Sequence, residues 1–428
     1  MTADCSRVDP NPSARECFGR STTRLYGTPG LTERKVAAND RGEPKASRGR
    51  RWGGAQRKVR KMARKLKSDR VLFLTTILLV GLSIVMVYSA SAVVGLERYG
   101  KPSMFLIKQA MWAVLGLGML GLVMRIDYRT YREPIFIWMF LSIVVAALVA
   151  VLFMPPVNNA RRWFGLAGIG VQPSEVAKLA AIFFIAALLE RRMHRINEVG
   201  YALAPIGLLV ACLFGLIVVE PDFGTSMSLV LIAFVMVFAA GLNYRYIAGV
   251  LLGAVPAMYI LVMGSAYRRR RVLTFLNPWE DPLGDGFQII QSLIAIGTGG
   301  VWGKGLMNGK QKLFYLPEPH TDFIYSVISE ELGLIGATVV LICFCIVTWR
   351  GLRVSLRAPD AFGAFLALGL TTMVAVQAFI NISVVLGLMP TKGIPLPFVS
   401  AGGSSLLINL VGMGILLNVS QHESSTEA

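Results

Sequence analysis

The chain of 428 residues is 54% hydrophobic and only 16% charged, with a mean hydropathy of +0.58. A soluble protein carries roughly 25% charged residues, so this composition excludes a disordered protein, a coiled coil and a disulfide-rich secreted module. The net charge of +18 is concentrated at the start, because residues 1–70 hold 19 Lys and Arg against 7 Asp and Glu. The five cysteines have no spacing that predicts a disulfide framework or a metal site.

Residues 1–70 predict a disordered, basic tail, because they are rich in Arg, Lys, Gly, Pro and Ser and lack apolar periodicity. The basic run at 57–70 directly precedes the first apolar run, where anionic lipid would attract it by about 1 kcal/mol per basic residue. A tail without a specific role, or a true start at Met62, explains the segment equally well. The basic run at 57–70 has no interleaved aromatic residues, so we expect no nucleic-acid binding.

Ten apolar runs follow the tail, most of them near the 20 or so residues that a membrane-spanning helix needs. Helices satisfy their own backbone hydrogen bonds in lipid. The sequence therefore predicts an all-α polytopic membrane protein with its membrane domain at 71–419 and a short tail at 420–428. The fourth and sixth runs are short and carry polar residues. The runs are 71–95, 104–124, 135–154, 174–190, 200–219, 226–241, 245–265, 323–348, 360–388 and 402–419.

The orientation of these spans follows from the Lys and Arg residues in the short loops, which favour the cytoplasmic side. With the tail in the cytoplasm, both termini are cytoplasmic and the segment 266–322 is a long extracytoplasmic loop before the eighth span. The inner loops then hold Arg125, Arg129, Arg132, Arg191, Arg192, Arg195, Arg245, Arg350, Arg353 and Arg357. The short outer loops hold Arg98, Lys101, Arg161, Arg162 and Lys392.

Three outer segments are dense in Gly, Pro and polar residues: 155–178, 316–333 and 389–405. Irregular backbone survives near lipid only where protein buries it or where it lines a wet cavity. Since all three segments fall on the same side of the predicted membrane, we expect them to form one outward-facing site.

Carboxylates in the second segment are the first candidates for chemistry. Asp322 follows His320 and Thr321 at the start of a span, where it can cap the helix or act as a general base that faces an outer cavity. Glu330 and Glu331 lie deeper in the same span. Ionisable groups within a membrane are costly and are paired or functional. We expect a structural hydrogen-bonding role for at least one of these two glutamates.

Charged residues in the other two segments are candidates for binding an anion. Glu175 and Lys178 are three residues apart on one helix face, where they can form an internal salt bridge or part of a polar cavity wall.

Arg161 and Arg162 are candidates for binding phosphate, because arginine binds phosphate through two hydrogen bonds. The run 268–271 is equally consistent with contact to lipid headgroups. The last span opens with a helix start that offers free N–H groups to an anion: Gly402, Gly403, Ser404 and Ser405.

The segments from 71 to 419 resemble the SEDS family, the bacterial shape, elongation, division and sporulation proteins. The segments QPSEVAK at 172–178, EPDFGTS at 220–226 and LPEPHTDFI at 316–324 are similar to family motifs. The stretch GKGLMNGKQKLFYLPEPHTDF looks more like the cell-division branch than the elongation branch. The most specific part is the C-terminal signature of Asn381, Gly387-Leu388-Met389-Pro390, Gly393-Ile394 and Phe398 to Ser405.

The resemblance implies a peptidoglycan glycosyltransferase, which polymerises lipid II into glycan strands outside the cytoplasmic membrane during septal wall synthesis. It implies that Asp322 is catalytic and that lipid II would donate its sugar by an inverting transfer from a diphosphate. A divalent cation, Mg or Mn, would assist that leaving group, although no dedicated metal ligands stand out. The resemblance also implies partners: a class B penicillin-binding transpeptidase and other divisome proteins. The candidate substrate-binding residues are Arg161, Arg162, Glu175, Lys178, His320, Thr321, Lys392, Ser400, Gly402 and Gly403.

Two other functions remain open on the sequence. A lipid II flippase would also have about ten spans and a polar cavity, but it needs buried charge that both sides of the membrane can reach. A non-catalytic scaffold that recruits a transpeptidase would not depend on Asp322. The gathering of the unusual segments on one side favours the enzyme.

Overall fold

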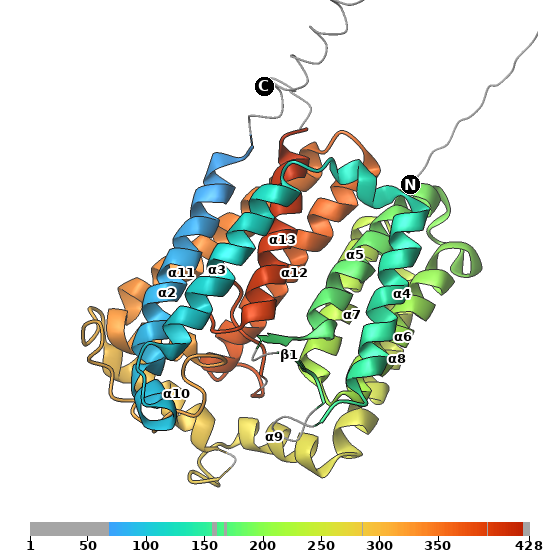
Figure 1. Ribbon diagram of the computed structural model, residues 1–428. Helices are drawn as coiled ribbons and strands as arrows, with labels where there is room; N and C mark the ends of the chain where they lie inside the picture. The colour runs from blue at the N-terminus through green and yellow to red at the C-terminus, as the bar shows by residue number, and fades with distance from the viewer. Residues whose placement is uncertain (1–67, 156–160, 167–168, 285, 392, 423–428) are drawn as a thin grey trace, which may run out of the picture. The chain divides into compact units, whose positions relative to one another are not determined.

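The computed structural model describes residues 68–155, 161–166, 169–284, 286–391 and 393–422 (Figure 1). The predicted tail lies almost wholly outside these residues, as do Lys392 and the last six residues. The long helices are α2 (Arg70–Tyr99), α3 (Met104–Val123), α4 (Pro134–Val151), α5 (Pro173–Arg192), α6 (Ala204–Val219), α7 (Phe223–Ala239), α8 (Tyr244–Met263), α9 (Ala266–Leu276), α10 (Phe287–Gly299), α11 (Ile324–Arg357), α12 (Ala361–Val385) and α13 (Gly403–Ser420).

Short elements connect these helices. The 3₁₀ turns η1 (Tyr128–Arg132) and η2 (Met193–Arg195) and the π-helical turn η3 (Val199–Leu203) lie between α3 and α6. Strands β1 (Phe164–Leu166) and β2 (Ile169–Val171) pair antiparallel in a hairpin ahead of α5, with Gly165 opposite Gly170. The all-α prediction did not include this hairpin, because three-residue strands leave no detectable alternation in a Gly-rich stretch.

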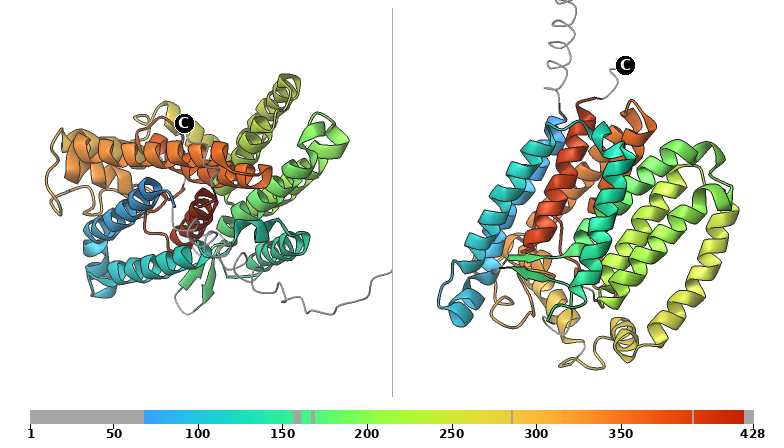
Figure 2. Two further views of the ribbon diagram at one scale, coloured as in Figure 1. Left: turned by 90° about the horizontal axis from the view of Figure 1, so that it is seen from above. Right: turned by 45° about the vertical axis from the view of Figure 1, so that its right-hand side comes forward.

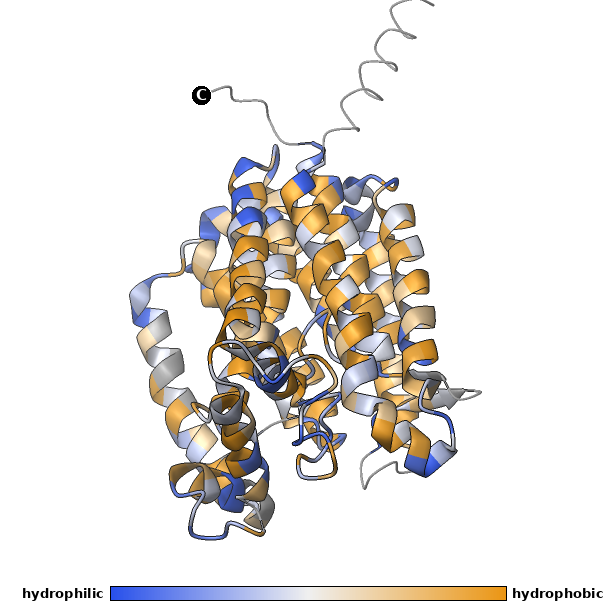
Figure 3. Cartoon of the chain, turned by 90° about the vertical axis from the view of Figure 1, so that its left-hand side faces the viewer, coloured by the Kyte–Doolittle hydropathy of each residue, from blue (hydrophilic) through white to orange (hydrophobic). Residues whose placement is uncertain are grey.

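Each of the ten predicted spans coincides with a helix, from α2 to α8 and from α11 to α13. Seven helical segments of the described chain are long and apolar enough to cross a membrane: α2, α3, α4, η3 with α6, α11, α12 and α13. Apolar residues cover the middle of the helices and polar residues gather toward their ends (Figure 3). The protein is therefore a multi-pass helical membrane protein. The segment 266–322, predicted as a loop, contains the helices α9 and α10.

Helices α12 and α13 form the interior of the bundle. Within their most apolar stretches, 67% of α12 and 78% of α13 is buried, against 22% to 44% in the other five candidate spans. Helix α13 packs against α3, and α12 packs against α11, α5 and α7 (Figure 2). Both carry buried amides, such as Gln377, Asn381 and Asn409. Interior positions suit these residues, because polar side chains in membrane proteins hydrogen-bond between helices rather than face lipid.

The two ends of the described chain meet at one end of the bundle. Asp69 caps α2 by accepting hydrogen bonds from the amides of Val71 and Leu72. Its own amide donates to Ser420 Oγ at 3.1 Å, and its carboxylate pairs with Arg350 at 2.6 Å. The start of α2, the end of α13 and the last part of α11 therefore lie together. We call this the terminal end, and the opposite end, with β1, α9 and α10, the hairpin end (Figure 1).

Helix α11 is interrupted at Gly333, which has φ 68° and ψ −167°. The backbone of the loop after α10 supplies the hydrogen bonds that the broken turn lacks: the amides of Lys304 and Gly305 donate to the carbonyls of Glu330 and Glu331. The amide of Leu334 donates in turn to Gly300. A Cβ atom on Gly333 would lie 2.3 Å from the amide nitrogen of Gly303. The close approach of two backbones therefore requires glycine here.

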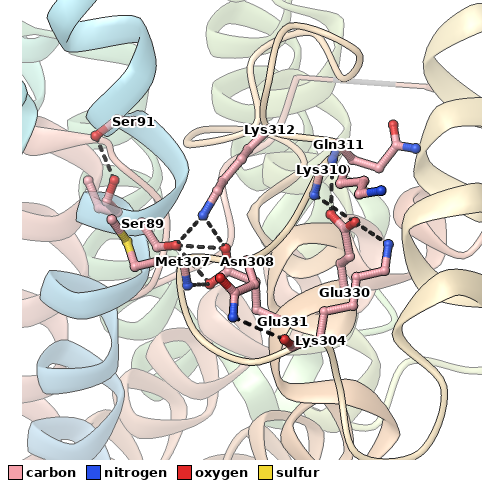
Figure 4. Close-up of polar contacts among 11 residues, drawn as sticks. Ser89, Ser91, Lys304, Met307, Asn308, Lys310, Gln311, Lys312, Glu330 and Glu331 are labelled. Carbon is pink, nitrogen blue, oxygen red and sulfur yellow. Dashed lines mark hydrogen bonds and ion pairs between the residues drawn. The ribbon is translucent and has the colours of Figure 1, made fainter.

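Both glutamates of this interrupted turn hold the loop after α10 in place (Figure 4). Glu331 accepts hydrogen bonds from Ser89 Oγ of α2 at 2.7 Å and from Lys312 Nζ at 2.6 Å. Glu330 accepts from Lys304 Nζ at 2.8 Å and from the amide of Lys310 at 2.9 Å. Both carboxylates are fully buried. The structural role expected for at least one of them is confirmed for both.

Candidate functional site

A cavity of about 460 Å³ lies at the hairpin end of the bundle. It is placed there because Asp322 and Phe323 precede the first residue of α11, whose last part lies at the terminal end. Its charged lining residues are Arg162, Asp222, Arg271, Glu318 and Asp322, and its apolar ones include Phe223, Met258, Val262, Val272 and Phe323. Such a lining suits a ligand with both an ionic group and a hydrocarbon chain.

Asp322 is held in this cavity by backbone contacts from two other segments. Asn381 of α12 donates through its side-chain amide to the carbonyls of Asp322 and Ile394, each at 2.8 Å. Gly393 faces the carboxylate so closely that a Cβ atom there would lie 2.9 Å from Oδ2 of Asp322. The turn formed by His320, Thr321 and Asp322, which we call the HTD turn, is thus joined to the loop before α13 through Asn381. Glycine at position 393 leaves room for the carboxylate.

The environment of Asp322 makes its carboxylate a stronger base than usual. Burial and, to a smaller extent, the negative charge of Glu318 raise the pKa of Asp322 to about 7, against the opposing charges of Arg271 and Arg162. Part of the Asp322 side chain still faces the cavity. A carboxylate with a pKa near neutrality is well matched to take up a proton at physiological pH.

Two arginines supply positive charge to the same cavity. Arg162, just ahead of β1, donates from Nε to the carbonyl of Glu220 at 3.1 Å and from Nη2 to Pro221 at 2.5 Å. Arg271 of α9 donates from Nη1 to the carbonyl of Thr391 at 2.7 Å. Both guanidinium groups are anchored by backbone carbonyls, which add no full negative charge. The positive charge of Arg162 therefore remains available to an anionic ligand.

The cavity does not include every residue that the sequence suggested for an anion. Arg161, next to Arg162 in sequence, is exposed and donates to the carbonyl of Leu152 at 2.9 Å. It does not line the cavity. Successive side chains of an extended segment point in opposite directions, so only one of the two neighbouring arginines reaches the site. Lys392 lies outside the described residues.

Glu175 and Lys178 form a buried pair near the cavity rather than part of its lining. Their charged atoms are 2.8 Å apart, with side chains 3% and 0% exposed. The start of α5 reaches the site through Gln172, whose Nε2 donates to Oδ2 of Asp222 at 2.8 Å. Ser174 contacts the same carboxylate oxygen at 3.4 Å. The pair therefore supports the helix start that positions Asp222.

The residues around the HTD turn act mainly through packing and backbone contacts. The His320 ring lies against Phe105 of α3, with centroids 4.7 Å apart, and burial lowers the pKa of His320. Its carbonyl accepts from the amide of Ala401 at 2.9 Å. Ser400 donates its hydroxyl to the carbonyl of Thr321 at 2.6 Å. The cavity lining includes none of the three predicted residues in this region, His320, Thr321 and Ser400.

The start of α13 is covered by an aromatic side chain. A Cβ atom on Gly403 would lie 2.1 Å from Nε1 of Trp112. Gly402 caps the helix without a side chain, and neither glycine lines the cavity. The helix start that the sequence suggested for an anion is thus packed against α3.

Two lining carboxylates, Asp222 and Glu318, were not singled out from the sequence. Both stand inside motifs, EPDFGTS and LPEPHTDFI, so the motif was the available signal. A turn in which Thr321 donates to the carbonyl of Glu318 at 3.3 Å brings Glu318 back beside Asp322. Among the described residues, no group of three His, Cys, Asp or Glu side chains has the arrangement of a metal site.

Taken together, the bundle and its cavity define a multi-pass membrane protein with one charged, partly apolar site at the hairpin end. The chain belongs to the family of cell cycle proteins that includes FtsW, RodA and SpoVE, whose model matches residues 69–425.

Relatives of this family match nearly their whole length. The chain is 45% identical to the probable peptidoglycan glycosyltransferase FtsW of Geobacter metallireducens over 365 residues, covering 84% of this chain and 96% of the relative. It is 42% identical to the stage V sporulation protein E of Bacillus subtilis over 364 residues, covering 84% and 98%.

Solved structures show the same fold. A chain from a peptidoglycan synthase complex, solved to explain how polymerization and crosslinking are coordinated, superposes with a TM-score of 0.69 at 30% identity. The rod shape determining protein RodA of Thermus thermophilus superposes with a TM-score of 0.63 at 27% identity. Each match covers 84% of this chain and 99% of the solved one.

Proposed function

We propose that this chain is a peptidoglycan glycosyltransferase that polymerises lipid II into glycan strands, with Asp322 as its catalytic base. The observation that carries the proposal is the cavity in which Asp322, with a pKa raised to about 7, lies beside Arg162 and Arg271. Glycosyltransferase activity is supported by relatives at 45% identity that are named probable peptidoglycan glycosyltransferases.

The chemistry assigns a separate task to each part of the cavity. The hydroxyl of the acceptor sugar loses its proton to Asp322 as it attacks the anomeric carbon of the donor. The bond to the donor's diphosphate breaks, and Arg162 and Arg271 stabilise the negative charge that develops there. A diphosphate leaves without a proton, so a second carboxylic acid, which glycosidases need, is not required. Attack opposite the leaving group inverts the anomeric centre.

The apolar part of the cavity suits a lipid-linked donor. Phe223 and Phe323 border the charged groups, while Met258 and Val262 come from α8. Helix α8 lies at the margin of the bundle (Figure 2), with exposed apolar residues such as Leu252 and Tyr259. A prenyl chain could therefore reach lipid while its diphosphate and sugars occupy the charged side.

The proposed topology has ten spans, with the terminal end in the cytoplasm and the cavity on the outer side. This placement is supported by the arginines near the terminal end, among them Arg129, Arg132, Arg350 and Arg357, which follow the positive-inside preference. The 1–70 tail would then lie in the cytoplasm beside anionic lipid, ahead of a membrane domain at 71–419.

The proposed setting is septal wall synthesis during cell division, with a class B penicillin-binding transpeptidase and other divisome proteins as partners. Relatives named FtsW support the division role. The match to a chain from a complex that joins polymerization with crosslinking supports a crosslinking partner.

Purified protein supplied with labelled lipid II, with and without the transpeptidase partner, tests the activity directly. We expect glycan strands, seen as a ladder of products after electrophoresis. If neither preparation makes strands, the same protein in liposomes should be tested for lipid II flipping, because flipping without polymerisation would favour the flippase. Absence of both activities, with the partner still bound, would favour the scaffold.

Removal of the Glu318 charge should make Asp322 a weaker base. Because Glu318 raises the pKa of Asp322, Glu318→Gln lowers that pKa, and the acid limb of the polymerisation rate moves to lower pH. Glu318 is half exposed, with 52% of its side chain accessible, so the shift should be less than about one pH unit. A pH–rate profile of the variant beside wild type measures it. An unmoved or upward-shifted limb would contradict the assigned role of Glu318.

A further inference from the structure

Glu220 is a buried carboxyl that the proposed chemistry does not use. It lies between the end of α6 and the start of α7, and its side chain is fully buried. Neither of its carboxyl oxygens has a hydrogen-bond partner. An ionised carboxylate in such a place would be very costly, so the neutral form is favoured. Burial raises the pKa of Glu220 to about 8, with Asp222 adding to the increase and Arg162 opposing it.

The backbone of this residue anchors the arginine of the cavity. Arg162 donates from Nε to the carbonyl of Glu220 and from Nη2 to that of Pro221. None of the ion pairs within the described part of the chain includes Arg162. The carbonyl of Glu220 therefore holds the guanidinium group of Arg162, while the carboxyl group of Glu220 does not neutralise its charge.

The charged surroundings of Glu220 are few. Asp222 comes from the start of α7 and Arg162 from the segment before the hairpin. The helices α4, α6 and α7 contain no charged residue. Helix α5 brings the pair of Glu175 and Lys178, which is closed on itself at 2.8 Å. The charge of Glu220 would therefore be felt mainly by Arg162 and Asp222.

We propose that Glu220 is a positioning residue for the diphosphate of the lipid donor: its backbone carbonyl orients Arg162, and its neutral, buried side chain leaves the full guanidinium charge to the ligand. The inference rests on the proposed function and extends it to a residue that does not touch the cavity. Ionisation of Glu220 would place a negative charge beside Arg162 and weaken the hold on a diphosphate. Binding of the ligand should then weaken at alkaline pH.

Binding of undecaprenyl diphosphate, measured at several pH values without any turnover, tests this inference. For wild type we expect the Kd to rise about tenfold as Glu220 ionises, which corresponds to about 1.4 kcal/mol. In Glu220→Gln the side chain cannot ionise, so the Kd should keep only the smaller rise that ionisation of Asp322 in the same cavity contributes. The matched control is Glu190→Gln, at the terminal end, where Glu190 pairs with Arg132. This control should keep the alkaline rise.

An alkaline rise of wild-type size in a folded Glu220→Gln protein would overturn the inference. If that variant does not fold, Arg162→Gln provides the second test: its Kd should be high already at neutral pH and should lack the part of the alkaline rise that Glu220 contributes. An alkaline rise of wild-type size in Arg162→Gln would also overturn it. The proposed function is tested separately, because a wild-type protein that binds the probe with this pH dependence but makes no strands would refute polymerisation alone.

Discussion

Replacement of Asp322 by Asn should reduce the rate of lipid II polymerisation by about 10²- to 10⁴-fold, the usual contribution of a positioned general base. The amide keeps the size of the carboxylate but cannot take the proton of the attacking hydroxyl. The backbone carbonyl that Asn381 holds at 2.8 Å is unchanged by the substitution, so the turn should keep its shape. Initial rates of strand formation with purified protein measure the loss.

The loss should appear in kcat rather than in substrate binding. Arg162 and Arg271, which are proposed to hold the diphosphate, are untouched by the Asn substitution. The matched control is Asp127→Asn, which changes the cap of η1 and should leave the rate within a few-fold of wild type. If Asp322→Asn raised KM alone and left kcat intact, the carboxylate would serve in binding and not as the base.

Replacement of Glu331 by Gln should destabilise the folded protein by about 3–5 kcal/mol, the usual effect of breaking a buried ion pair. Lys312, whose side chain is only 4% exposed, would keep its charge without a counter-charge. Ser89 of α2 and Lys312 of the loop that links α10 to the HTD turn would both lose the carboxylate to which they donate (Figure 4). Thermal unfolding in detergent measures the global effect, and hydrogen exchange over 300–316 measures opening of this loop.

Two further variants separate the ion pair from the rest of the loop. Lys304→Met removes the partner of Glu330, but Lys304 is 29% exposed, so water can replace part of its contact and the cost should be smaller. Lys312→Met together with Glu331→Gln removes the uncompensated charge and should recover part of the lost stability. Equal stability of wild type and Glu331→Gln would mean that backbone contacts around Gly333 alone hold the loop.

The positions of the ten helices from α2 to α8 and from α11 to α13 could be predicted from the sequence, because the length of an apolar run reports a physical requirement of the bilayer. Even α5 was found, although it carries the buried pair of Glu175 and Lys178. The break at Gly333 and the helices α9 and α10 were not predicted. A local break depends on the second backbone that replaces its hydrogen bonds, and hydropathy carries no trace of that contact.

The composition of the cavity could be predicted only in part. Asp322 stood out because it lies at the start of an apolar run, and Arg162 because it is an arginine in a short outer loop. Asp222, Glu318 and Arg271 come together with them from three distant segments, and their meeting depends on how the helices pack. Arg161 was indistinguishable from Arg162 by sequence, since the direction of a side chain in an extended segment is set by its neighbours in space.

The central claim is that a carboxylate with a pKa near neutrality performs the base chemistry in this cavity. One comparison tests it most directly: polymerisation by wild type and by Asp322→Asn at saturating lipid II, each at about pH 5.5 and about pH 8. Because Asp322 must be deprotonated to act and its pKa is about 7, wild type should be several-fold faster at the higher pH. The Asn variant should stay near background at both. A variant as fast as wild type, with the same dependence on pH, would contradict the assignment of Asp322.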